Sequence, residues 1–215
     1  MACSETTLES FTLENRAHSF PPAAMRANYM IIGRCLHILT CFGNVKTRSI
    51  SSPVGLDLDD DLTLARLAAA WPRMESLALE TSLMNLPSGM TLQDLHALAV
   101  QCPQLYSLDM EFNPSPAPSL IGHACMSQYR MRYLDVGGSP ITRESRPPSI
   151  ARFLSSLFPN LARISTPREN EDNEDPEEID QHQEAIARHL LWKQVQDEIP
   201  EFVAARREEH NWARV

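Results

Sequence analysis

The chain has 215 residues, of which 43% are hydrophobic and 22% are charged, and its formal net charge is −9. This composition is ordinary for a globular protein of one or two domains, and it excludes wholesale disorder, a collagen-like fibre and a small disulfide scaffold. The isoelectric point near 5.2 has the wrong sign for a phosphate-binding surface, so we expect no nucleic-acid partner.

The N-terminal segment predicts neither export nor attachment to a lipid. Glu5 stands where a signal peptide needs positive charge, and Ala2 cannot be myristoylated in place of glycine. The five cysteines include no Cys-x-x-Cys pair, which argues against a zinc knuckle and a disulfide framework. We therefore expect a cytoplasmic or nuclear protein.

Residues 29–42 form the most apolar stretch of the chain. Arg34 and His37 interrupt it, and it is shorter than the roughly 20 residues that a bilayer requires. We therefore expect no membrane partner and interpret this stretch as a buried helix.

One phrase recurs along the chain, and it decides the predicted fold. WPRMESLALE at residues 71–80 returns as CPQLYSLDME at residues 102–111, each containing L-x-x-L-x-L or a close variant. Weaker copies bring the number to six, and the copies begin at Leu8, Val45, Met74, Leu105, Met131 and Leu161. Their spacing of 26 to 37 residues is somewhat longer than the roughly 20–29 residues of regular leucine-rich repeats.

Segments with helical periodicity precede several of these phrases. Apolar residues recur at helical spacing in residues 62–71, 92–102 and 150–158, and a proline then ends each segment. Stacked strand-loop-helix units bury one another's apolar faces. We therefore predict an α/β fold, with an irregular leucine-rich-repeat-like solenoid of about six repeats over residues 1–167. Its parallel strands are expected on a concave face and its helices outside.

The alternation of side chains within each phrase predicts which residues are exposed on the concave face. The fourth and sixth residues point inward, whereas the third, fifth and seventh point outward. The candidate partner-binding residues of the concave face are Glu80, Asp109, Glu111, Tyr133, Asp135 and Arg163. The acidic groups would select a basic protein ligand, and tyrosine adds contact area. The alternative is a sheet face that is merely solvated.

Three residues depart from the pattern of apolar interior positions. Arg48 occupies a position that points inward in the other repeats. Cys41 and Cys102 stand where other repeats have Trp71 and Phe158, so we expect small core residues instead of nucleophiles.

The phrases at residues 71–79, 102–110 and 158–164 resemble those of the fungal family of F-box and leucine-rich-repeat-like proteins, over about residues 8–166. In that family the F-box holds the adaptor subunit of a cullin-RING ubiquitin ligase, and the repeats hold the substrate. No F-box is seen here, because the repeats begin by Leu8 and the Leu86-Pro87 pair lies within a repeat loop. The resemblance implies a substrate-recognition part without its F-box, for which the ligase adaptor is not an expected partner.

The composition changes at residue 168. Residues 168–184 hold nine acidic residues and one arginine, so we predict an acidic flexible loop at residues 168–178. Residues 179–215 predict two helices, separated by Pro200, that cap the last repeat. The alternative is that these helices dock on another protein through Trp192, Phe202 and Trp212.

The sequence contains no catalytic, cofactor or metal motif that we recognise. The aspartates at 57 and 59–61 lack the glycine and glutamate of an EF-hand loop, and we interpret residues 59–61 as a helix cap. His182 and His189 form no H-E-x-x-H motif, and Gly137-Gly138 lacks a phosphate-loop context and predicts a repeat loop. We expect a non-enzymatic protein-binding module without a cofactor. The alternatives are a small α/β enzyme misread as repeats and a truncated fragment with no independent function.

Overall fold

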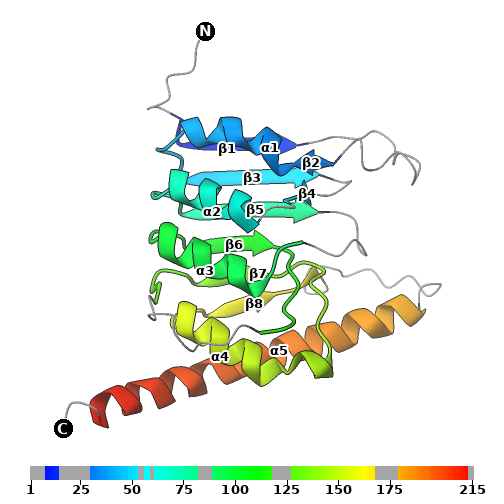
Figure 1. The fold of residues 1–215 in the computed structure, drawn as a ribbon. Helices are drawn as coiled ribbons and strands as arrows, with labels where there is room; N and C mark the ends of the chain where they lie inside the picture. The colour runs from blue at the N-terminus through cyan, green and yellow to red at the C-terminus, as the bar shows by residue number, and fades with distance from the viewer. Residues whose placement is uncertain are drawn as a thin grey trace.

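The computed structural model describes residues 8–14, 30–52, 56–58, 61–81, 89–117, 127–167 and 179–212. These residues form an α/β fold around a six-stranded parallel sheet (Figure 1). In spatial order its strands are β1 (Ser10–Glu14), β3 (Thr47–Ser52), β5 (Ser76–Thr81), β6 (Ser107–Met110), β7 (Tyr133–Asp135) and β8 (Arg163–Ser165). Each predicted repeat phrase contributes one strand, and the strands lie side by side in chain order.

The register of the sheet agrees with the predicted alignment of the phrases. Ser107 lies opposite Ser76 on one side and Tyr133 on the other, and Tyr133 lies opposite Arg163. The third residues of the phrases therefore form one row across the sheet. The positions predicted to point inward in β5 to β8 are buried, and they are Leu77, Leu79, Leu108, Met110, Leu134, Val136, Ile164 and Thr166.

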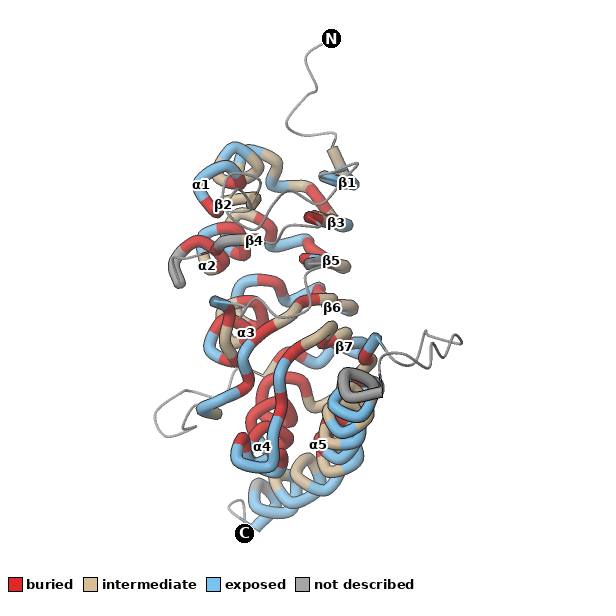
Figure 2. The backbone as a smooth tube through the Cα atoms, turned by 90° about the vertical axis from the view of Figure 1, so that its right-hand side faces the viewer, coloured by how far each residue is buried: buried red, intermediate tan, exposed pale blue. Residues whose placement is uncertain are grey.

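Helices cover one face of this sheet (Figures 1 and 2). They include α2 (Asp61–Ala70), α3 (Leu92–Gln101) and α4 (Pro147–Leu157), which confirms the three helical segments predicted before the prolines. Thr91 starts α3 with a capping box, in which its hydroxyl accepts from the amide of Gln93 and Asp94 accepts from the amide of Thr91. The residues that follow these three helices, Trp71, Cys102 and Phe158, are buried between the helices and the sheet.

Cys102 behaves as the predicted core residue. Its thiol is within hydrogen-bonding reach of the carbonyls of Ala68 and Trp71, at 3.5 and 3.6 Å. Burial raises the pKa of the Cys102 thiol to about 12, so the thiolate needed for nucleophilic chemistry is disfavoured.

Within the predicted buried helix at residues 29–42, the described residues 30–42 do not form one helix. Residues 31–41 contain β2 (Ile31–Ile32), one α-helical turn, α1 (Gly33–Leu36), and a 3₁₀ helix, η2 (His37–Cys41). β2 pairs in parallel with β4 (Leu56–Asp57) in a second, two-stranded sheet. The β-branched pair Ile31-Ile32 favours extended backbone. The apolar residues of this stretch do not recur at helical spacing, so they would not lie together on one face of a helix. Cys41 is exposed, contrary to the core position expected for it.

The sheet is not curled, so the inner curve expected of a concave face is not seen (Figure 1). A parallel sheet bends when the outer elements are spaced more widely than the strands, which lie about 4.8 Å apart. Here no helix lies between β6 and β7 in the described residues 111–117 and 127–132, and η2 replaces a regular helix after α1. The helical layer that the described residues form is therefore sparse. We call the sheet face that points away from α2, α3 and α4 the open face.

The C-terminal segment is one helix instead of the predicted two. α5 (Ile179–Trp212) runs through Pro200 without ending. Pro200 is exposed, and a proline on the solvent side of a helix costs one backbone hydrogen bond and does not disturb packing on the other side. The predicted acidic loop at residues 168–178 lies outside the described residues.

α5 packs against α4 and crosses the β8 end of the sheet (Figures 1 and 2). Trp192, Val195 and Ile199 belong to the hydrophobic core, and the indole of Trp192 donates to the carbonyl of Ser139 at 3.2 Å. Phe202 is partly buried against the same core, whereas Trp212 is 80% exposed. Of the three residues considered for docking on another protein, Trp192 is therefore occupied within the fold.

Candidate functional site

Three rows of side chains cross the open face, because neighbouring strands are in register. The first row is Ser10, Thr47, Ser76, Ser107, Tyr133 and Arg163; the second is Thr12, Ser49, Ala78, Asp109, Asp135 and Ser165; the third contains Glu14, Ser51 and Glu80. Glu111 follows β6 directly. The structure thus brings the six candidate residues together on, or next to, four neighbouring strands, β5 to β8.

Asp109 is the central acid of this face. It is half-buried and lies between Ala78 and Asp135 in the pairing register. Burial, together with the nearby charges of Asp135, Glu80 and Glu111, raises the pKa of Asp109 to about 7. A cation placed next to it would favour the ionised form, so Asp109 is a position where a basic group is stabilised.

Glu111 and Asp135 also have a structural role that the sequence pattern did not predict. The amide of Gly137 donates to the Oδ1 of Asp135 at 2.9 Å, and the amide of Gly138 donates to the Oε1 of Glu111 at 2.8 Å. Gly137 has a φ of 51°, and a Cβ there would lie 2.6 Å from the Cγ of Glu111. The two carboxylates therefore hold the turn after β7. Their replacement would disturb this turn as well as the surface.

Tyr133 is part of an aromatic pair. It is 43% exposed, and its ring meets that of Tyr106 edge to face with centroids 5.2 Å apart. A hydrogen bond with Tyr133 raises the pKa of Tyr106. Tyr106 lies just before β6, outside the alternating strand positions, so the sequence pattern did not predict that it is exposed.

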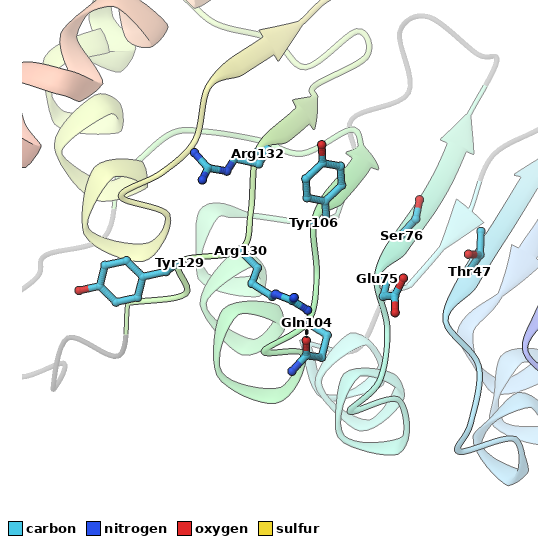
Figure 3. A pocket seen from close by; sticks show the side chains of 8 residues that line it. All are labelled: Thr47, Glu75, Ser76, Gln104, Tyr106, Tyr129, Arg130 and Arg132. Carbon is cyan, nitrogen blue, oxygen red and sulfur yellow. Dashed lines mark hydrogen bonds between the residues drawn. The ribbon is translucent and has the colours of Figure 1, made fainter.

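A pocket of about 560 Å³ lies at the N-terminal ends of the central strands (Figure 3). We call it the Tyr–Arg pocket, and its lining residues are Thr47, Glu75, Ser76, Gln104, Tyr106, Tyr129, Arg130 and Arg132. Arg130 donates to the side-chain oxygen of Gln104, and Arg132 donates to the carbonyl of Asn160 at 3.2 Å. None of the pocket residues was among the predicted candidates, because most of them lie in the turns that precede the strands.

The part of the chain that the structure describes contains no group of three or more His, Cys, Asp or Glu residues placed to hold a metal ion. His189 is hydrogen-bonded to the hydroxyl of Thr166 at 2.8 Å. Asp59 and Asp60, of the predicted helix cap, lie outside the described residues. None of the described helices combines the length and apolar character needed to cross a bilayer.

Comparison with known proteins adds no further identification. No family model matches the chain, and no curated protein matches it in sequence. The chemistry proposed for this chain therefore depends on its own residues: the acids of the open face and the tyrosines and arginines of the Tyr–Arg pocket.

Proposed function

We propose that this chain is a non-catalytic protein-binding module, cytoplasmic or nuclear, that holds its partner on the open face. We further propose that its stacked units are leucine-rich-repeat-like, and that it corresponds to the substrate-recognition part of an F-box type receptor. The observation that carries the proposal is the open face itself. Within the described residues, α2, α3 and α4 lie on the opposite side (Figure 2), and α5 crosses the β8 end (Figure 1).

The composition of the open face favours a basic protein partner. Glu80 and Asp109 lie on adjacent strands, and Asp135 faces Asp109 from the next strand. Complementary charge of this kind steers association and fixes the orientation of the partner. The exposed tyrosines next to these acids are of the residue type that contributes most to contact energy in protein interfaces.

The strand order favours a binding module over the alternative of a small α/β enzyme. In doubly wound α/β enzymes the strand order reverses, and the crevice at the reversal holds the ligand. Here the six strands follow the chain without reversal. The open face therefore offers a broad surface, and the Tyr–Arg pocket lies at the opposite strand ends from such a crevice.

Affinity purification of the full chain followed by mass spectrometry tests the proposal. The test variant is Glu80→Lys with Asp109→Lys, because these two acids do not hold the Gly137-Gly138 turn. The matched control is Glu201→Lys, which reverses an exposed charge on α5. We expect partners that bind the wild type and the control to be lost from the double variant, while its melting temperature stays near that of the wild type.

Partners that bind the folded double variant as well as the wild type would overturn the open-face proposal. Recovery of a ligase adaptor subunit with the wild type is not expected, and would instead indicate a direct contact with the ligase.

A further inference from the structure

The open face carries a second charged subsite, of opposite sign to its acids. Arg130 and Arg132 lie in the Tyr–Arg pocket, whereas Asp109 and Glu80 lie further along the strands. We propose that this pocket binds a carboxylate side chain of the same peptide segment whose basic group lies over Asp109, with Arg130 as the main cation. This inference rests on the proposed function of the open face.

The first support is that the two arginines have no acidic partner among the residues that the structure describes. Arg130 donates to an amide oxygen of Gln104, and Arg132 donates to a backbone carbonyl. A guanidinium has five donors, so each retains donors for a further acceptor. A carboxylate is the acceptor whose geometry matches the guanidinium in a paired, charge-assisted hydrogen bond.

The charge of the pocket selects a carboxylate over a phosphate. Besides the two arginines, the lining contains Glu75, which is exposed at the same pocket. The lining therefore has one net positive charge. A singly charged carboxylate balances this charge, whereas a doubly charged phosphate would exceed it and lie close to Glu75.

The aromatic residues make the pocket suitable for a peptide. Tyr106, Tyr129 and Tyr133 are 47%, 62% and 43% exposed, and the first two line the pocket. Tyrosine and arginine are the residue types that most often dominate binding energy in protein interfaces. Exposed tyrosine rings beside arginines that lack an acidic partner in the described residues therefore provide apolar contact area around a charged anchor.

The sheet geometry sets the spacing of the two charges on the ligand. Arg132 is level with Tyr106, because the amides of Arg132 and Tyr133 both donate to the carbonyl of Tyr106. Arg130 reaches further from Asp109, because it donates to Gln104. Asp109 lies three residues after Tyr106 and five residues after Gln104, which corresponds to about 10 to 17 Å at the rise of a strand. Alternate side chains of an extended peptide point to the same side, so a peptide that follows the strands would carry its acidic and basic residues about four positions apart.

Selection from a displayed library of random peptides, each about a dozen residues long, tests the inference with a defined probe. The immobilised proteins are the wild type, Arg130→Glu, Asp109→Lys and the control Arg66→Glu, which reverses an exposed charge on α2. From the wild type and the control we expect peptides with an acidic and a basic residue at the stated spacing. The affinity of the best peptide should fall by about tenfold or more with Arg130→Glu.

The outcomes separate this inference from the function on which it rests. Peptides that lose affinity with Asp109→Lys but not with Arg130→Glu would overturn the carboxylate site and leave the open face as a binding surface. Peptides insensitive to both variants, or no selected peptides, would contradict the open face as well. If a phosphoserine in place of the acidic residue tightens binding more than about tenfold, the assignment to a carboxylate is wrong.

Discussion

At the residue scale, the most unusual side chain is Arg48, a cation inside the core. It is 1% exposed, and its guanidinium carbon lies 3.3 Å from the centre of the Trp71 ring and 4.4 Å from that of Phe11. One of its terminal nitrogens donates to the carbonyls of Leu39 and Phe42, whereas Nε and Nη1 have no partner in the described residues. Burial also lowers the pKa of Arg48, which indicates a cost of desolvation.

Arg48→Met tests whether the charge or the volume of this side chain matters. Methionine retains much of the contact with Trp71 and removes two buried, unpaired donors, so we expect the free energy of unfolding to change by less than about 1 kcal/mol. Arg48→Ala leaves a cavity beside Trp71 and should cost about 3 kcal/mol. Urea denaturation followed by tryptophan fluorescence measures both. Equal losses in the two variants would show that the cation–π contacts and carbonyl hydrogen bonds dominate.

Asp109 predicts a pH dependence of stability. Its pKa is raised in the folded state to about 7 from 3.8, by burial and by Asp135, Glu80 and Glu111, so the folded state holds the proton more tightly than the unfolded state. The stability from Asp109 is therefore fully present below about pH 4 and is lost as the pH rises to about 7.

Asp109→Asn should remove this loss. Relative to the wild type, we expect no gain in the free energy of unfolding near pH 4 and a gain of about 1 kcal/mol near pH 8; the gain is small because the half-buried carboxylate is screened by solvent. Urea denaturation at several pH values measures the difference. If the free energies of unfolding of the wild type and Asp109→Asn change in parallel between pH 4 and pH 8, the raised pKa of Asp109 is contradicted.

At the element scale, the turn after β7 depends on a glycine in the left-handed region. Gly137→Ala places a Cβ at a φ of 51° and 2.6 Å from the Cγ of Glu111, so we expect a loss of about 2 kcal/mol in the free energy of unfolding. Gly89→Ala is the matched control, because a Cβ there has no atom within 4 Å, and it should change stability by less than about 0.5 kcal/mol. Thermal unfolding compares the two, and equal effects would contradict the steric argument.

The contact of α5 with β8 closes the exposed end of the sheet. The side-chain oxygen of Gln196 accepts from the backbone amide of Ile164 at 2.7 Å. This amide of the end strand points away from β7, so Gln196 supplies the acceptor that a neighbouring strand would otherwise provide. An uncovered end strand presents such groups to other chains and favours aggregation. α5 therefore protects β8 by a hydrogen bond as well as by covering the apolar core.

Gln196→Ala should destabilise this contact by about 1–2 kcal/mol, because it leaves a partly buried amide without its acceptor. The amide of Ile164 should then exchange with deuterium faster than in the wild type. Gln194→Ala is the control, since Gln194 is exposed on the same helix and bonds only to Glu198 among the contacts described. An unchanged exchange rate at Ile164 in Gln196→Ala would show that packing of α5 alone protects the strand.

At the scale of the whole molecule, the net charge of −9 is not spread over the fold. Nine acidic residues stand in residues 168–184, mostly in the segment outside the described residues. The partner preference that we propose for the open face therefore depends on a few placed charges, which are the acids near Asp109 and the arginines near Tyr106. Both signs occur on one face, so we expect the proposed basic partner to present an acidic group as well.

The number, order and register of the six strands followed from the sequence by itself. Each strand is a local pattern in which alternate residues are apolar. When six copies of one phrase pair side by side, only one register places the apolar residues of all six strands on the same, buried face. The three helices that end just before prolines were also predictable from local sequence. Their apolar periodicity lies within each helix, and the proline that ends each helix follows it closely.

The remaining features were decided by contacts between segments that are distant in the chain. α5 continues through Pro200 because the proline lies on the exposed side of a helix whose other side packs on α4 and β8. Glu111, which follows β6, accepts from the amide of Gly138, which follows β7. The Tyr–Arg pocket is lined by side chains from several turns. A local pattern determines which face of a strand or helix is apolar, whereas the charges and turns that neighbouring units place side by side depend on how those units stack.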